Sequence, residues 1–278
     1  MGQNPAKLAA AVHCQLGKIV GAVPVNDIAF GLDIKRIESK ALSGCEGALL
    51  TVSNKSKGAI AFKHGASYAR QRFTIAHELG HFLNDGHRPV KDLSGFQCTK
   101  DDMSVRERKR GKPLSKYQRQ ELEANVFASE LLMPVYKLQP YLSLSPSLQH
   151  VLDIARALDV SKEAAANRYV KTHDNPIAIV FSQNNVIRYI SKDEDFPRTL
   201  VWNNYALPHE VMNASAGLSD IEDHDTDVWL KAPETPSLDL QTLGQTNGHQ
   251  MTLLILPETD DDEDLGIETS YGRFNRFN

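Results

Sequence analysis

Apolar residues recur at helical spacing in two segments of the first half of the chain. In residues 73–83 the apolar positions lie three or four residues apart, and the turn sequence Asn-Asp-Gly ends the pattern. Residues 117–132 show the same spacing and stop before Pro134. Side chains three and four residues apart share one face of a helix, so both segments are predicted to be helices. Two shorter helices are predicted upstream, an amphipathic one over residues 6–20 and a short one over residues 27–32.

Two short apolar runs precede the first of these long helices. Residues 47–52 and 58–62 are separated by the polar stretch 54–57, which is typical of a hairpin loop. We expect residues 58–62 to be an edge strand, to which an extended peptide could add, and residues 64–72 to be a polar connection.

The second half of the chain contains more strand-like runs. Residues 148–171 suit two short helices with Ser161 as the N-cap of the second, which resembles a helix-turn-helix. Residues 177–181 and 186–190 suit a hairpin, and residues 251–256 suit another strand. These elements predict an α+β protein.

Composition indicates a cellular location but does not identify a partner. The chain has 278 residues, 41% of them hydrophobic, and a formal net charge of −4. Three cysteines without CxxC spacing favour a reducing, cytoplasmic location, and no apolar run is long enough to span a bilayer, so we expect no membrane partner. The basic stretch 100–119 and the acidic run 260–264 are interpreted as solvated loops, with a nucleic-acid or acidic-partner patch as the alternative for the first.

A His-Glu-x-x-His pattern lies inside the apolar helix 73–83. Residues four apart share a helix face, so His77 and His81 can both direct a ring nitrogen at one ion, which suits tetrahedral zinc. Glu78 beside them is the candidate general base for a water in the open coordination position. The alternative is two histidines that face solvent, which the apolar surroundings disfavour because unpaired ionisable groups are costly to bury.

A catalytic zinc needs a third protein ligand, and the sequence offers two. Glu121 and Asn125 share a face of helix 117–132, so Glu121 can bind the metal while Asn125 hydrogen-bonds a ligand histidine. Glu123 should face away from them. His87 stands where a longer histidine motif places its third ligand, but no hydrogen-bond partner for it is visible in the sequence, and we favour Glu121.

Two further roles stay open. Three residues are available to stabilise an oxyanion, with nothing to select among them: His64, Tyr68 and Tyr136. Three aromatic residues of the second half either line a ligand pocket or pack in a core: Trp202, Tyr205 and Trp229.

Two motifs taken together resemble the ImmA/IrrE family of metallo-endopeptidases. They are Arg-Phe-Thr-Ile-Ala-His-Glu-Leu-Gly-His over residues 72–81, and Glu-x-x-Ala-Asn-x-Phe-Ala-x-Glu-Leu-Leu-Met-Pro over residues 121–134. The resemblance implies that His77, His81 and Glu121 bind zinc, with Glu78 as the catalytic glutamate. It also implies site-specific cleavage of a helix-turn-helix repressor, although the basic insertion before Glu121 departs from the family pattern and leaves the substrate open.

The resemblance and the patterns together predict three parts. They are a zincin-like metallopeptidase domain with a small sheet beside its active-site helices over residues 1–145, a helix-turn-helix-like segment over residues 146–175, and a mixed or β-rich domain with an acidic tail over residues 176–278.

The expected mechanism is attack of zinc-activated water on a peptide carbonyl, with Glu78 accepting a proton and passing it to the leaving amine. The alternative is a DNA-binding or stress-response regulator whose zinc site is structural or vestigial. Its recognition helix would be residues 162–171, whose polar side chains are Lys162, Asn167, Arg168 and Lys171. Packing of that helix against the protein is the plainer interpretation.

Overall fold

The computed structural model describes residues 3–89, 95–102, 113–231 and 237–257. These residues form an α+β architecture with seven α-helices and two sheets, as predicted. The helices are α1 (Pro5–Leu16), α2 (Val25–Gly31), α3 (Tyr68–Leu83), α4 (Lys116–Leu132), α5 (Val135–Leu142), α6 (Leu148–Ala157) and α7 (Lys162–Thr172). The strands are β1 (Ile34–Lys40), β2 (Gly47–Thr51), β3 (Gly58–Lys63), β4 (Gly95–Cys98), β5 (Ile177–Gln183), β6 (Val186–Lys192), β7 (Gly217–Leu218), β8 (Glu222–Asp225), β9 (Ser237–Gly244) and β10 (His249–Ile255).

Parts of two predictions lie outside these residues. Half of the basic stretch 100–119, residues 103–112, and all of the acidic run 260–264 fall there. Among the described helices, none has the length and apolar character needed to cross a membrane.

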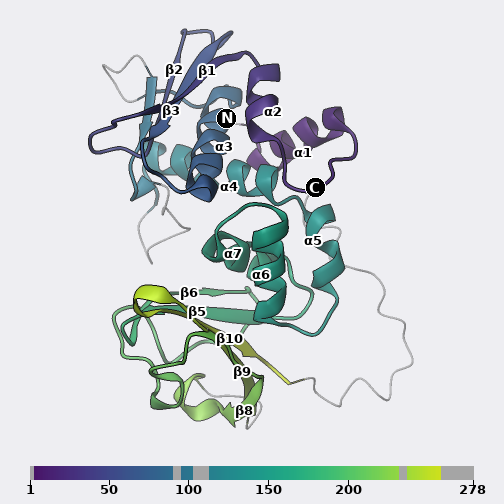
Figure 1. Cartoon of the computed structure of the whole chain (residues 1–278), viewed down its shortest axis with the longest axis vertical. Helices are drawn as coiled ribbons and strands as arrows, with labels where there is room; N and C mark the ends of the chain where they lie inside the picture. The colour runs from purple at the N-terminus through teal and green to yellow at the C-terminus, as the bar shows by residue number, and fades with distance from the viewer. Residues whose placement is uncertain (1–2, 90–94, 103–112, 232–236, 258–278) are drawn as a thin grey trace.

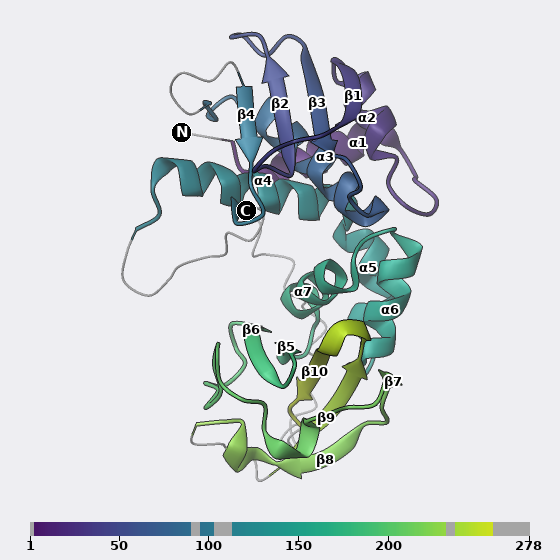
Figure 2. The same cartoon turned by 60° about the vertical axis from the view of Figure 1, so that its left-hand side comes forward.

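The N-terminal sheet has four strands in the order β1-β3-β2-β4, with α3 packed against it (Figures 1 and 2). Strand β1 is parallel to β3, and β2 is antiparallel to both β3 and β4. The expectation that residues 58–62 form an edge is therefore wrong, because β1 covers that side and leaves β1 and β4 as the edges. Strand β1 was not predicted from the sequence because four of its seven side chains are charged and only Ile34 is buried, as suits an edge.

Helix boundaries follow local capping groups. Helix α3 begins at Tyr68, inside the predicted polar connection, because the Ser67 side chain accepts a hydrogen bond from the backbone N–H of Arg70. Helix α1 ends at Leu16, earlier than predicted, where Gly17 adopts a φ of 65° that favours glycine.

The C-terminal sheet has the order β6-β5-β10-β9-β7, and β8 also pairs with β9. The predicted hairpin is confirmed as β5 and β6, joined through Asn184 and Asn185 at φ values of 50° and 61°. Asparagine tolerates this left-handed region better than most residues, which explains the tight turn. Strand β10 is confirmed, whereas β9 and helix α5 were not predicted.

One apolar cluster contains residues from all three predicted parts of the chain. Leu142, Leu148 and Ile177 belong to one buried cluster that runs from α1 through α3–α7 to the helix-covered face of the C-terminal sheet. A second cluster lies on the other face of that sheet and includes Trp229.

The three aromatic residues do not line a common pocket. Trp229 is fully buried and its indole N–H donates to Glu210. Trp202 and Tyr205 are half-exposed and contact each other, with ring centroids 4.8 Å apart.

Candidate metal centre

Helices α3 and α4 approach closely because small residues stand where they cross. A Cβ on Gly80 would lie 2.9 Å from the ring of Phe127, which is too close to fit without a shift. On α4, Ala124 and Ala128 are fully buried at the same contact. The close approach brings the His-Glu-x-x-His face of α3 against the Glu121 face of α4.

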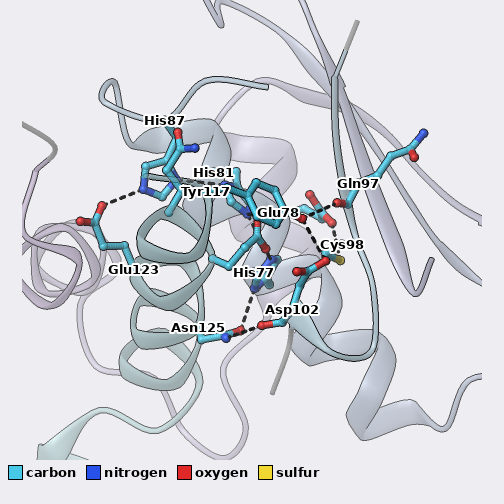
Figure 3. Close-up of polar contacts among 12 residues, drawn as sticks. His77, Glu78, His81, His87, Gln97, Cys98, Asp102, Tyr117, Glu123 and Asn125 are labelled. Carbon is cyan, nitrogen blue, oxygen red and sulfur yellow. Dashed lines mark hydrogen bonds and ion pairs between the residues drawn. The ribbon is translucent and has the colours of Figure 1, made fainter. Parts of the chain in front are cut away.

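Three donor atoms converge between these helices, and Figure 3 labels the two histidines that supply two of them. His77 Nε2 lies 3.1 Å from His81 Nε2 and 3.2 Å from Glu121 Oε2, and His81 Nε2 lies 3.5 Å from Glu121 Oε1. All three side chains are at most 2% exposed. Tetrahedral zinc with bonds of about 2.0 to 2.1 Å holds its nitrogen and oxygen ligands about 3.3 Å apart, so the spacing of this donor set fits such an ion.

The electrostatics of the donor set also suit a cation. Burial acts to raise the pKa of Glu121, but its contacts with His77 and His81 outweigh burial and lower it to about 2. Burial lowers the pKa of His81 to about 3, despite its contact with Glu121. Burial also acts to lower the pKa of His77, but its contact with the Glu121 carboxylate and the charges of Glu78 and Glu121 outweigh burial, and the net shift is upward. The site therefore combines a carboxylate anion with a neutral imidazole on His81.

The Nδ1 side of His77 is held by α4. Asn125 donates through Nδ2 to the backbone oxygen of Asp102 over 3.0 Å, so its Oδ1 is the atom that faces His77 Nδ1, also at 3.0 Å. His77 must then carry a proton on Nδ1, and Nε2 is the nitrogen that faces the converging site. This is the hydrogen bond that the spacing of Glu121 and Asn125 predicts.

Glu78 lies beside the donor set but uses different contacts. Its Oε1 accepts a hydrogen bond from the Cys98 thiol over 2.9 Å, while its buried Oε2 has no hydrogen-bond partner among the described residues. Burial raises the pKa of Glu78 to about 7, an effect that the nearby His77 charge and the Cys98 contact partly offset. A Cβ on Gly47 of β2 would come within 2.8 Å of Glu78 Oε1, so glycine makes room for this carboxylate.

His87, the other candidate third ligand, lies on the far side of His81. Its Nδ1 is 2.9 Å from His81 Nδ1, and its Nε2 is 2.9 Å from Glu123 Oε2. It is therefore not among the converging atoms. Glu123 does face away from Glu121, as expected, but it supplies the partner for His87 that the sequence did not reveal.

The three oxyanion candidates are placed away from the donor set. His64 contacts Ser39, and Tyr68 and Tyr136 are 62% and 50% exposed. Tyr117 is nearer, because it lies one helical turn before Glu121 on α4, and its hydroxyl donates to the Asp102 carboxylate over 2.9 Å. The four-residue spacing from Glu121 is a signal that could have identified Tyr117, whereas Cys98 and Asp102 had no such signal.

The fold and the donor set together define an α+β protein with a histidine-and-glutamate site on two packed helices. Residues 46–169 match the family model of peptidase family M78, described as the IrrE N-terminal-like domain. The match agrees with the family that the two motifs resemble.

Comparison with other proteins adds a likeness of fold. The structure is similar to a solved structure titled "Mycobacterium tuberculosis transcriptional regulator", with a TM-score of 0.54, 14% sequence identity, and coverage of 91% of this chain and 76% of that one. A search of curated proteins finds no match.

Proposed function

We propose that this protein is a zinc-dependent endopeptidase with His77, His81 and Glu121 as metal ligands and Glu78 as the general base. The observation that carries the proposal is the separation of the three donor atoms, between 3.1 and 3.5 Å, in a fully buried setting. Without a cation, three buried groups with converging lone pairs would have to share protons among themselves. Three protein ligands are the number that catalytic zinc sites use, with a fourth position left for water or substrate.

The proposed reaction assigns one role to bound zinc and another to Glu78. Bound zinc supplies Lewis-acid polarisation of a peptide carbonyl and lowers the pKa of a water molecule. Glu78 has one carboxylate oxygen held by Cys98 and one oxygen without a hydrogen-bond partner among the described residues, so the second is available to accept a proton. A pKa near 7 suits a group that accepts a proton and then gives it to a leaving amine at neutral pH.

Strand β4 offers a route for an extended substrate. It pairs with β2 on one side and with no other described strand. Its last residue, Cys98, contacts Glu78, so a peptide added to the open side of β4 would pass close to the general base. This replaces the edge role that the sequence suggested for residues 58–62. On the family resemblance, we propose a regulatory protein of the helix-turn-helix repressor type as the substrate, in a cytoplasmic setting.

Mapping of new protein N-termini in cells that express either the wild type or Glu78→Gln tests the activity. We expect the wild type to generate a small set of new N-termini, concentrated in one regulatory protein. Glu78→Gln should reduce them by about 100-fold or more, because it removes general-base catalysis, and should still bind zinc.

Glu163→Gln is the matched control, because this glutamate lies on α7 and contacts Tyr189 and Arg188, away from the donor set. It should cleave like the wild type. Equal cleavage by Glu78→Gln, or no cleavage by a zinc-loaded wild type, would contradict the proposal.

The DNA-binding alternative has weaker support. On α7, Arg168 is buried and forms a two-pronged ion pair with Glu130, and Asn167 donates to Tyr189 and to the backbone of Glu163. Two of the four polar side chains of the supposed recognition helix are therefore used within the protein. A gel shift at low salt with operator-like DNA would revive this alternative.

A further inference from the structure

A chain of hydrogen bonds leads from a carboxylate near the surface to the back of one proposed metal ligand. Glu123 on α4 contacts His87 Nε2, and His87 Nδ1 contacts His81 Nδ1, each over 2.9 Å (Figure 3). His81 and His87 are 1% exposed, whereas the side chain of Glu123 is 26% exposed. Neither His87 nor Glu123 belongs to the converging donor set.

The chemistry of these groups determines where the protons lie. An ionised carboxylate only accepts hydrogen bonds, so His87 must carry a proton on Nε2 to bond Glu123. A neutral His87 then presents a lone pair at Nδ1, and His81 must donate to it from its own Nδ1. The remaining nitrogen of His81, Nε2, is left with a free lone pair directed at His77 and Glu121.

The surroundings hold this chain in one arrangement. Asn84 donates to the same carboxylate oxygen of Glu123 over 3.4 Å, and its backbone oxygen accepts from the backbone N–H of His87 over 3.0 Å. The ring of His81 stacks on Phe96, with centroids 4.6 Å apart. His81 is thus fixed by a ring stack on one face and by a hydrogen bond at its edge.

We propose that His87 and Glu123 form a positioning relay that sets the tautomer and ring orientation of His81 for metal binding. The proposal rests on the proposed zinc site and adds two residues to it that touch neither metal nor substrate. The relay differs from the support of His77, which is a neutral amide, Asn125, bonded to a backbone carbonyl. A charged group, the Glu123 carboxylate, therefore stands behind His81 but not behind His77. Zinc affinity should depend on Glu123 although this side chain faces away from the proposed metal site.

Zinc Kd values, measured by competition with a chromophoric chelator, test the relay. His87→Phe keeps the ring volume but removes the acceptor for His81, and should weaken zinc binding by about 10- to 100-fold. Glu123→Ala should weaken it comparably, whereas Glu123→Gln keeps an acceptor oxygen and should lose less. The melting temperature of each zinc-free variant separates this effect from unfolding, because loss of packing alone would lower it.

Two control variants match these changes in kind. His150→Phe alters a half-buried histidine that contacts Tyr169 in the helical middle of the molecule, and Glu163→Gln alters a carboxylate on α7. Both should leave the zinc Kd unchanged. Nitrogen-15 spectra of the zinc-loaded wild type should show the His81 proton on Nδ1, and this readout does not depend on any variant folding.

The outcomes separate the relay from the site on which it rests. Zinc binding by the wild type with an unchanged Kd in His87→Phe and Glu123→Ala would overturn the relay alone. So would a His81 proton on Nε2. Complete loss of zinc in His87→Phe with retention in Glu121→Ala would make His87 a ligand and overturn both, as would a wild type that binds no zinc.

Discussion

The contact between α3 and α4 and the C-terminal sheet bury different kinds of polar group. Beside the N-terminal sheet, helices α3 and α4 bury ionisable side chains against one another: His77, Glu78, His81 and Glu121. In the C-terminal sheet, the buried polar groups of β9 and β10 are neutral, and they are Gln241, Thr242, Gln250 and Thr252. Both sites that could hold a metal in the described part of the chain include His77, and neither lies in the C-terminal sheet.

This contrast indicates where the chemistry lies. Neutral amides and hydroxyls satisfy one another within a core, as the contact between Gln250 and Thr252 does. Ionisable groups are costly to bury and are retained where their charge has a use. The α3–α4 contact, where ionisable groups are buried together, is therefore where we place the proposed activity.

A buried ion pair joins the two regions, and breaking it should have the largest effect on stability. Arg168 on α7 donates to both oxygens of Glu130 on α4, each over 2.6 Å, and both side chains are largely buried. Glu130→Ala leaves the guanidinium without its carboxylate and should lower the free energy of unfolding by about 3 kcal/mol. Urea denaturation measures this loss.

Asp153→Ala is the control for that change. Its partner Arg156 is 78% exposed, so removal of this pair should cost about 0 to 1 kcal/mol. An equally small cost for Glu130→Ala would show that the free energy of unfolding does not depend on this ion pair. It would also weaken the argument that Arg168 is unavailable to contact DNA.

A smaller effect is expected at Cys98, within the N-terminal region. Cys98→Ala removes the donor to Glu78 Oε1 and should reduce cleavage about 2- to 10-fold, the equivalent of one hydrogen bond of about 0.5 to 1.5 kcal/mol. Cys98→Ser keeps a donor and should retain most of the activity, and neither variant should change zinc content. Wild-type cleavage rates in Cys98→Ala would show that Glu78 needs no such anchor.

Sequence spacing was sufficient to predict which side chains of one helix lie together in the candidate site. His77 and His81 are four residues apart on one helix, with Glu78 beside them, and Glu121 and Asn125 are four residues apart on another, so each pair shares one face. The match between the two sets depended on small residues, Gly80 and Ala124, that let the helices approach. The structure brings together all five side chains that this reasoning selected.

Contacts between segments far apart in sequence were beyond such reasoning. Cys98 reaches Glu78 only because β4 pairs with β2, and nothing in four residues of strand indicates that pairing. Glu123 meets His87 because of how the loop after α3 lies over α4, which helix periodicity does not predict. The polar strand β1 lacked the apolar alternation by which strands are recognised.

Zinc stoichiometry, measured by elemental analysis of the purified protein, tests the central claim most directly. The account predicts one zinc in the wild type, loss of zinc in Glu121→Ala, and retention of zinc, at reduced affinity, in His87→Ala. A wild type without zinc, or a Glu121→Ala variant that keeps it while His87→Ala loses it, would contradict the account.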